Sequence, residues 1–251
     1  MKKLAMLALI IVIGGCVKST YPVVEGKNLS AVFFDVGQGD SSLVITPDNK
    51  KILIDCGEYN DTLVYLQAMN ITEIDVLVIT HPDIDHSGGC DSVIRNVNVD
   101  KILTNTNVEK DFLLDITDTA MLEVIVAYDS YGRFTGDNDN SVLLKAGYGN
   151  ISFLFTGDCG WRCEKELITT EDIDVDVLKV GHHGSGHSTT AEFLEKTSPS
   201  AAVISSGAGN RYGHPANETL ERLREVNAAV YRTDARGTII ITTDGSTYSV
   251  I

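Results

Sequence analysis

The chain has 251 residues, of which 43% are hydrophobic and 22% charged. This composition is typical of a globular protein and excludes a disordered one, and the length allows one substantial α/β domain or at most two domains. The formal net charge is −15 at pH 7. Such an acidic chain repels polyanions at long range, which argues against binding of nucleic acid through a broad basic surface.

The N-terminal segment differs in character from the rest of the chain. Lys2 and Lys3 precede an uncharged run, 4–15, that ends in small residues before Cys16. The run is short for a bilayer span, which takes about 20 residues, and its pattern predicts an export signal. Its end resembles the lipobox of prokaryotic lipoproteins, which implies that Cys16 is lipidated. An uncleaved membrane anchor is the alternative, and both place the domain outside the cytoplasmic membrane, either anchored to its outer face or extracellular.

We therefore expect a lipoprotein-like signal peptide over 1–16, a tether over 17–28 and one folded domain over 29–251. From residue 29 onward, short apolar runs predict strands at 30–36, 41–46, 51–54, 75–80, 101–104, 122–127, 141–146, 151–155, 175–180, 201–205 and from 229 onward. Helices are predicted at 61–69, 87–97, 109–121, 164–168, 189–196 and 215–226. In each half strands come first and then alternate with helices, which favours two sheets packed face to face with helices outside.

Four potential metal ligands lie within six residues, directly after the run 74–80 that predicts a buried strand: His81, Asp83, Asp85 and His86. Two imidazoles and two carboxylates packed this densely repel one another or stay hydrated unless a cation lies among them. Divalent ions of the borderline and hard classes accept histidine nitrogen and aspartate oxygen together. A polar turn is the alternative interpretation, but turn chemistry does not require the histidines. The segment therefore predicts a metal site.

Polar residues also follow two later predicted strands. Asp158 follows the strand 151–155, and His182 and His183 follow the strand 175–180. The six histidines of the chain are confined to positions 81, 86, 182, 183, 187 and 214. Ligands at the ends of core strands are held rigidly, which metal sites require. We expect these residues to converge on one site, with His187 an ordinary surface residue.

Several of these segments, in this order, resemble the metallo-β-lactamase superfamily: Ile52–Gly57, His81–His86, Thr156–Asp158 and Gly181-His182. The family signature is usually H-x-H-x-D-H, so Asp83 stands here in place of the second histidine. With Phe34–Ser41, Lys179–Ser185 and Asn210–Pro215, this variant is similar to the soluble hydrolase domain of ComEC-type DNA-uptake proteins and their freestanding relatives. The resemblance covers 29–251 and implies a four-layer αββα sandwich that binds two divalent metal ions.

The resemblance assigns His81 and Asp83 to the first metal and Asp158 to a bridge between both metals. The superfamily usually supplies another histidine to the first metal, but none occurs from 87 to 181. The polar run 137–141 lies where that ligand is expected. Either Asp139 or Asn140 fills the position with an oxygen, or the first metal site is weak and partly occupied by water.

For the second metal, the resemblance implies Asp85, His86 and a late histidine. His182 is the preferred residue and His183 the alternative. Asp55 matches a residue that braces the ligand loop without binding metal. The metals are zinc or manganese, since carboxylate-rich ligation shifts the preference toward manganese.

Two divalent ions about 3.5–4 Å apart can lower the pKa of a shared water toward ~7, which supplies a nucleophile without a serine or cysteine. No G-x-S-x-G elbow supports serine hydrolysis. Asp85 and Asp158 would act through the metals. The candidates for orienting substrate or protonating the leaving oxygen are Lys179, His183, His187, Arg211 and His214. For Lys179, a strand lysine that faces solvent is the alternative interpretation.

The sequence thus predicts an exported metal-dependent phosphodiesterase or nuclease, linked through the resemblance to DNA uptake or degradation. A hydrolase of a small ester, phosphorylcholine, lactone or lactam is a second hypothesis. A non-catalytic, metal-containing binding subunit of an uptake apparatus is a third.

Besides Cys16, the chain has Cys56, Cys90, Cys159 and Cys163. An even number in an exported protein allows two disulfides, but the sequence does not assign the pairs. Cys159 and Cys163 lie within reach of each other if a helical turn separates them, and Cys56 and Cys90 could meet across the predicted site.

Overall fold

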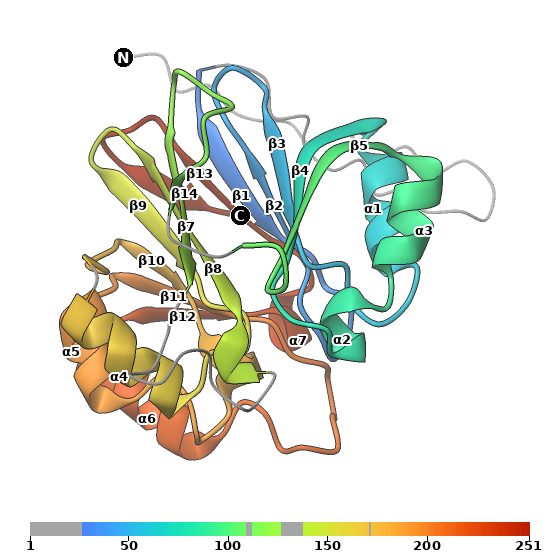
Figure 1. The fold of residues 1–251 in the computed structure, drawn as a ribbon. Helices are drawn as coiled ribbons and strands as arrows, with labels where there is room; N and C mark the ends of the chain where they lie inside the picture. The colour runs from blue at the N-terminus through green and yellow to red at the C-terminus, as the bar shows by residue number, and fades with distance from the viewer. Residues whose placement is uncertain (1–26, 109–111, 127–137, 171) are drawn as a thin grey trace, which may run out of the picture.

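A computed structural model describes residues 27–108, 112–126, 138–170 and 172–251. The predicted signal peptide, Cys16, most of the predicted tether and Asp137 lie outside these residues. In the described part, two seven-stranded sheets pack face to face and helices cover their outer faces (Figure 1). No helix in these ranges is both long and apolar enough to cross a membrane.

The first sheet has the strand order β14-β13-β1-β2-β3-β4-β5. Its strands are β1 (Leu29–Phe33), β2 (Ser42–Ile45), β3 (Lys51–Ile54), β4 (Glu73–Ile79), β5 (Asn98–Thr104), β13 (Ile239–Thr243) and β14 (Tyr248–Val250). The strands from β3 to β5 are parallel and the others antiparallel. Helices α1 (Asp61–Ala68) and α3 (Cys90–Asn96) lie on the outer face, and the single turn α2 (Ile84–Ser87) follows β4 (Figure 1).

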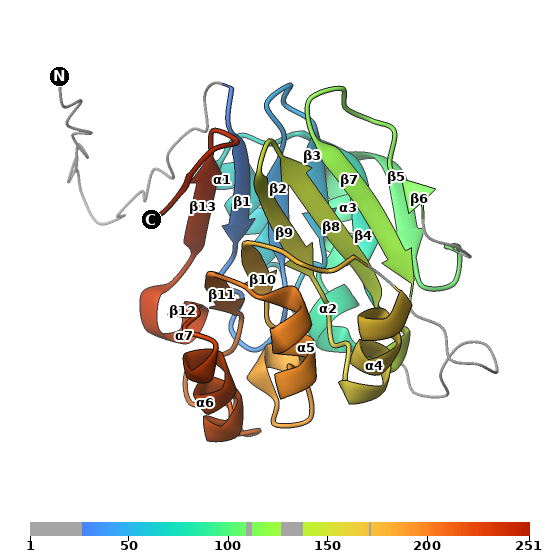
Figure 2. The same ribbon diagram turned by 90° about the vertical axis from the view of Figure 1, so that its left-hand side faces the viewer.

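The second sheet has the order β12-β11-β10-β9-β8-β7-β6. Its strands are β6 (Phe112–Leu113), β7 (Met121–Val126), β8 (Val142–Tyr148), β9 (Ile151–Phe155), β10 (Val177–Lys179), β11 (Ala201–Ile204) and β12 (Ala229–Arg232). The strands from β9 to β12 are parallel. Helices α4 (Trp161–Thr170), α5 (Ala191–Thr197) and α6 (Asn217–Glu225) cover its outer face, and the turn α7 (Thr233–Arg236) follows β12 (Figure 2).

Three clusters of buried apolar side chains correspond to the three contacts between layers. The central cluster takes residues from both sheets, such as Phe33 and Phe155, whose rings stack 5.6 Å apart. A second cluster joins the first sheet to α1 and α3, and a third joins the second sheet to the helices α4 to α6. The central strands of both sheets are therefore buried on both faces, which explains why strands such as β3 and β9 are nearly continuous apolar runs. The predicted four-layer αββα fold is confirmed.

One element prediction was wrong. The helix predicted over 109–121 is not formed, because within its described part 112–113 is a strand, β6, and 121 begins β7, with which it pairs. The apolar residues there serve pairing in the sheet, which overrides helical periodicity. The helix predicted over 87–97 is confirmed as α3, which Gly88 and Gly89 separate from the preceding turn α2. A Cβ at either glycine would overlap the backbone carbonyl oxygens of Glu58 or Cys56, so close packing against that loop requires glycine.

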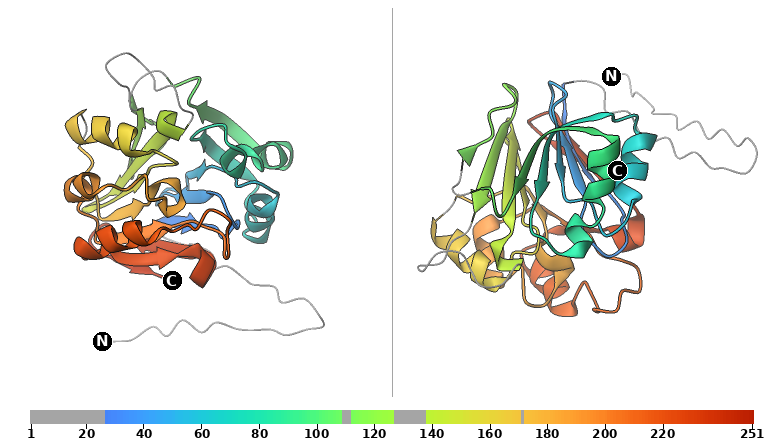
Figure 3. Two further views of the ribbon diagram at one scale, coloured as in Figure 1. Left: turned by 90° about the horizontal axis from the view of Figure 1, so that it is seen from below. Right: turned by 45° about the vertical axis from the view of Figure 1, so that its right-hand side comes forward.

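The strands β3, β4, β9, β10 and β11 all end at the same edge of the sandwich, which Figure 3 (left) shows from below. Open α/β sheets place ligands beyond the carboxyl ends of their strands. The polar segments predicted to form a site follow these strand ends.

Candidate metal centre

Asp55 braces the loop that carries the predicted ligands. It follows β3 with a left-handed backbone (φ 58°), a conformation that is uncommon outside glycine. Its carboxylate accepts hydrogen bonds from the Thr80 amide and hydroxyl, both at 2.8 Å, and Oδ2 lies 2.8 Å from Nδ1 of His86. Because the carboxylate holds Nδ1 as the protonated nitrogen, the Nε2 lone pair of His86 is free to bind a metal. Asp55 thus braces the ligand loop through Thr80 and His86, as the sequence analysis expected.

Asp158, at the end of β9, divides the other predicted ligands into two groups. Its Oδ1 lies 3.1 Å from His86 Nε2 and 3.5 Å from His183 Nε2. Its Oδ2 lies 3.6 Å from His182 Nε2 and 3.9 Å from His81 Nε2. We call Asp85, His86 and His183 the inner group, and His81, Asp83 and His182 the outer group. A carboxylate whose two oxygens face separate sets of ligands is in the position of a bridge between two metals.

The structure places the late histidines differently from the expectation. The sequence favoured His182 beside Asp85 and His86, but His183 occupies that place, with Nε2 3.2 Å from Asp85 Oδ2 and 3.4 Å from His86 Nε2. His182 joins the outer group, where no middle histidine is available. Both residues have left-handed backbones (φ 48° and 53°). Two successive residues in this strained region direct their rings to opposite oxygens of Asp158, an arrangement that the sequence pattern does not reveal.

Asp40, which the sequence analysis treated only as part of a turn, lies behind His183. Its Oδ1 is 3.2 Å from His183 Nδ1, and the Ser205 carbonyl is 3.0 Å from the same nitrogen. Both neighbours accept, so Nδ1 carries the proton and Nε2 is free toward the inner group. With His86, Asp158 and His183, Asp40 forms a buried set of potential metal ligands. An acidic residue between two strands, directly after a G-x-G turn, was the available signal.

Lys179 neutralises Asp40. Its ammonium group lies 2.7 Å from Asp40 Oδ2 and donates to the Val180 carbonyl at 3.0 Å, with only 2% of the side chain exposed. The sequence analysis offered two roles for Lys179, a group that orients substrate or a strand lysine that faces solvent. The structure shows neither, because Lys179 is buried against Asp40. Its physical role is to keep the buried Asp40 carboxylate charged and in place.

The charges around Asp158 favour cations. Burial by itself would lower the pKa of His86, but the Asp158 and Asp55 carboxylates raise it well above its ordinary value. Burial likewise lowers the pKa of His183, yet Asp158 and Asp40 raise it to about 10. The carboxylates thus favour positive charge on the imidazoles of His86 and His183, whose Nε2 atoms lie only 3.4 Å apart. Divalent ions supply that charge while leaving the imidazoles neutral.

Unsatisfied buried atoms point to the same conclusion. His81 Nε2 and Asp158 Oδ1 are buried without a hydrogen-bond partner among the described residues. Burial, and next the charge of His86, lower the pKa of His81, so its imidazole is neutral and its lone pair available. Buried polar atoms without partners are costly and require an explanation. The two donor groups fit two divalent metal ions, with nitrogen and oxygen ligands that suit zinc or manganese.

The described part of the polar run, 138–141, reaches the centre through Asn138, which the sequence analysis did not single out. The Asn138 amide nitrogen lies 3.4 Å from Asp158 Oδ2. Asp139, an expected ligand, instead accepts a hydrogen bond from the Gly160 amide at 3.2 Å through Oδ1. Asn140 lies in the same single turn, Asn138–Asn140, and is half-buried. The turn therefore approaches the outer oxygen of Asp158, on the side where the missing histidine was expected.

Two disulfides surround the centre, and the pairs left open by the sequence are Cys56–Cys90 and Cys159–Cys163. Cys56 follows Asp55, and its amide donates to the His86 carbonyl at 2.8 Å. Cys90 is four residues beyond His86. The first disulfide therefore joins the bracing loop to the ligand loop.

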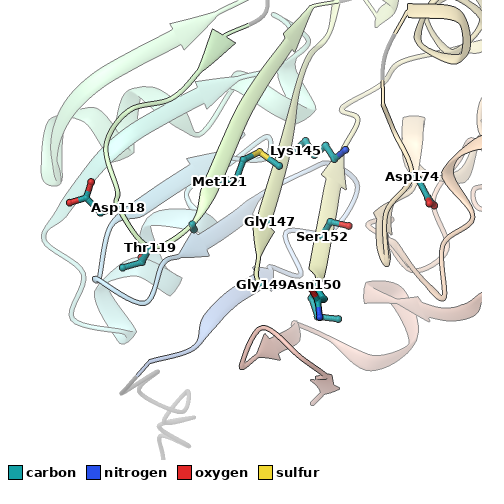
Figure 4. Close-up of a pocket in the computed structure, with 11 residues that line it drawn as sticks. Asp118, Thr119, Met121, Lys145, Gly147, Gly149, Asn150, Ser152 and Asp174 are labelled. Carbon is teal, nitrogen blue, oxygen red and sulfur yellow. The ribbon is translucent and has the colours of Figure 1, made fainter.

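A separate hollow of about 540 Å³ lies at the opposite end of β8 and β9, around the turn at Gly149 and Asn150 (Figure 4). Lys145 and Ser152 are among its lining residues. None of the predicted site residues line it, so it is distinct from the candidate metal centre.

Comparison with known proteins agrees with this geometry. Residues 34–112 match the family model of the metallo-beta-lactamase superfamily. Over these residues the chain resembles the metallo-β-lactamase superfamily. A putative metal-dependent hydrolase from Parabacteroides distasonis has the same fold, with a TM-score of 0.57 at 15% identity over 82% of this chain and 94% of that one. The chain thus has the metallo-β-lactamase fold of metal-dependent hydrolases, as the sequence predicted.

Among curated proteins, this chain is similar to ComE operon protein 3 of Bacillus subtilis (strain 168), with 31% identity over 87% of this chain and 33% of that protein. Competence protein ComA of Neisseria gonorrhoeae is 29% identical over 92% of this chain and 34% of that protein. The chain spans about a third of the length of these relatives. The predicted resemblance to competence proteins is confirmed.

Proposed function

We propose that this chain is a metal-dependent phosphodiesterase that cleaves nucleic acid. The observation that carries the proposal is Asp158, whose two oxygens face the inner and outer groups separately. A pair of adjacent metals is a recurrent arrangement for in-line displacement at phosphorus. The competence proteins that the chain resembles support nucleic acid as the polymer.

In this proposal, Asp85, His86 and His183 hold the inner metal, and His81, Asp83 and His182 hold the outer one, with Asp158 between them. When bound, such ions lower the pKa of a water toward ~7 and screen charge on the attacked group. Asp55 and Asp40 keep the Nε2 atoms of their histidines unprotonated and aimed at the centre.

His214 is the residue best placed to contact the leaving group. Its ring centroid lies 5.7 Å from that of His182 and 6.4 Å from that of His183, and it is only half-buried. Burial, with the charges of His182 and His183, lowers its pKa, which leaves a neutral ring beside the cationic site. A half-buried imidazole at the mouth of the site can donate a hydrogen bond to an oxygen of the substrate.

The acidic surface favours the second hypothesis. With 20 Lys and Arg against 35 Asp and Glu, the chain offers few contacts to phosphates. A hydrolase of a small ester, phosphorylcholine, lactone or lactam would not need them. We retain this alternative as an outcome of the test below.

For the N-terminal segment, we infer export and attachment to the outer face of the cytoplasmic membrane through lipidated Cys16. The sequence pattern of 1–16 supports this inference. Expression of the chain and of Cys16→Ala in a bacterial host tests it. We expect the wild-type chain in the membrane fraction and the variant outside it, and equal fractionation would contradict the anchor.

The deciding experiment measures metal content and hydrolysis of a generic phosphodiester together, for the wild type and Asp85→Ala. We expect about two metals per wild-type chain and activity with manganese or zinc, with the loss of one metal and of activity in the variant. Asp91→Ala is the matched control, because Asp91 is an exposed aspartate of α3 that pairs with Arg95, its neighbour on the same helix.

If the wild type cleaves no phosphodiester but does cleave a lactone or lactam, the small-ester hydrolase replaces this proposal. Bound metal with no turnover of any substrate would favour the non-catalytic binding subunit.

A further inference from the structure

The loop 205–216 between β11 and α6 is held in one conformation by Asn210. Its Oδ1 accepts hydrogen bonds from the amides of Tyr212 and His214 at 3.1 and 3.0 Å, and its Nδ2 donates to the carbonyls of Gly207 and His214. Figure 1 shows this loop in orange, below α7. A side chain that satisfies four backbone groups fixes the positions of the residues it spans. Tyr212 and His214 are therefore presented in a set geometry.

From this loop, a series of rings runs from solvent to the metal centre. The Tyr212 ring is 53% exposed and stacks on His214, with centroids 5.7 Å apart and planes at 24°. His214 in turn meets His182 edge-on at 5.7 Å. The Tyr212 ring is thus separated from the His182 ring of the outer group by the single ring of His214.

Arg211 adds a cation to this platform. Its guanidinium lies 4.9 Å from the centroid of the Tyr212 ring, and Nη2 donates to the tyrosine hydroxyl at 2.7 Å. The planar guanidinium over an aromatic face is itself a surface on which bases stack, and its charge pairs with phosphate. An exposed pair of this kind can therefore bind both the base and the phosphate of a nucleotide.

A second pair has the same composition. Trp161, the one tryptophan of the sequence, is 52% exposed at the first turn of α4, and Arg162 lies 5.4 Å from its ring centroid. Trp161 is three residues beyond Asp158, and its amide donates to the His187 carbonyl at 3.1 Å. The strands β9 and β11, which precede the two pairs, flank β10, which delivers His182 and His183. The pairs therefore come from both neighbours of the strand that carries the late ligands.

We propose that the Tyr212–Arg211 and Trp161–Arg162 pairs bind unpaired bases of the substrate by stacking, on the two sides of the scissile phosphodiester. This inference rests on the proposed phosphodiesterase function and adds the residues that select the substrate. Stacking contributes about 1–3 kcal/mol per base and needs no sequence preference. It does not depend on a basic surface, so an acidic chain can hold a single strand locally.

The pairs discriminate against the other phosphodiesters considered above. A duplex hides the faces of its bases, and holding it would require many more phosphate contacts than 20 Lys and Arg in an acidic chain offer. Choline also binds to aromatic rings, but through its positive charge. An arginine over each ring repels that charge, so the platforms favour a base next to a phosphate.

The first test uses the full chain after removal of metal with a chelator, so that binding is measured without cleavage. The probes are a short single-stranded oligothymidylate and an abasic strand of the same length, which carries the same phosphates without bases. We expect the oligothymidylate to quench the Trp161 fluorescence and bind roughly tenfold or more tightly than the abasic strand. Equal affinity for both strands, or binding of neither, would overturn the proposal.

Variants then assign the effect to the pairs. In fluorescence anisotropy with labelled strands, Tyr212→Leu and Arg211→Ala should lose most of the preference for bases. Arg236→Ala is the matched control, because Arg236 also lies over a tyrosine, Tyr231, at 5.0 Å, but outside the loop 205–216. A preference for bases that survives both Tyr212→Leu and Trp161→Leu would contradict the assignment.

Kinetics of the metal-loaded chain separate this inference from the proposed function. The substrates are a nucleoside p-nitrophenyl phosphodiester and methyl p-nitrophenyl phosphate, which differ in the nucleoside. We expect Tyr212→Leu to lower the ratio of their kcat/KM values by about tenfold. Cleavage of both with an unchanged ratio would sink the stacking proposal and leave the phosphodiesterase, whereas cleavage of neither by the wild type would sink the proposed function.

Discussion

The inner and outer groups of the metal centre use the same kinds of ligand but differ in how they are supported. In the inner group, both histidines are held at Nδ1 by buried carboxylates, His86 by Asp55 and His183 by Asp40. In the outer group, His81 Nδ1 meets the Thr80 hydroxyl at 3.1 Å, and Asp83 is 44% exposed. Carboxylate support fixes the ring and raises its basicity. We infer that the inner group binds metal more tightly and that the outer group faces the substrate.

Asp158→Ala should abolish the difference between the two groups, because it deletes the carboxylate whose two oxygens face them separately. We expect loss of both metals and of hydrolysis down to background. Metal analysis and a phosphodiester assay measure the two effects, with Asp91→Ala as the control. Retention of one metal per chain would mean that the inner group is complete without the bridge.

Lys179→Met should show what the buried support of the inner group contributes to the fold. Removing one partner of a buried ion pair costs about 3–5 kcal/mol, since the other charge is left unpaired. Urea unfolding of the metal-free chain measures this loss. The double variant Asp40→Asn with Lys179→Met should recover part of it, and additive losses in the double variant would show that the two residues are not coupled.

The two disulfides should differ in their effects on the inner group. In the chain-entropy model, Cys56–Cys90, which closes 34 residues, contributes about 4 kcal/mol, and Cys159–Cys163, which closes four, about 2 kcal/mol. Paired Cys→Ala variants compared by urea unfolding measure this difference. Removal of Cys56–Cys90 should also weaken metal binding, because it frees the bracing loop from the ligand loop; equal metal affinity in both paired variants would contradict this.

Asp55→Asn should weaken the inner metal by roughly 10- to 100-fold, the usual effect of removing the partner of a metal-bound histidine. The amide keeps the shape of the side chain but loses its charge. Competition with a chromophoric chelator measures the affinity. An unchanged first dissociation constant would show that the Asp55 charge is not needed.

Asp83→Asn should give the smallest change and affect only the more weakly bound metal. The Asp83 side chain is 44% exposed, so water can replace its oxygen. In the same chelator titration, the tighter step should stay unchanged while the weaker step shifts. A shift of the tighter step would reverse our assignment of inner and outer groups.

Prediction from sequence succeeded where a feature of the structure depends on the residues of one short segment. Apolar runs of the right length located β3 and β9 to the residue, and the ligand-rich loop His81–His86 identified metal chemistry. It failed for 112–121, where pairing between β6 and β7 overrides helical periodicity.

It also preferred His182 to its alternative, His183, for the second metal, because the strained backbone that aims each ring leaves no mark in the spacing of the residues. Asp40 and Lys179 could not be understood from sequence, since they lie 139 positions apart and only the packing of the two sheets joins them.

The sequence by itself therefore determined the resemblance to the superfamily, the four layers and most of the residues that reach the metal centre. These features depend on short segments whose residue types by themselves indicate strands, helices or metal ligands. Only the tertiary structure decided which oxygen of Asp158 each ligand faces, which carboxylate supports which histidine and which arginine lies over which exposed ring. Those relations depend on distances between strand ends that meet at one edge of the sandwich, and chain separation carries no information about them.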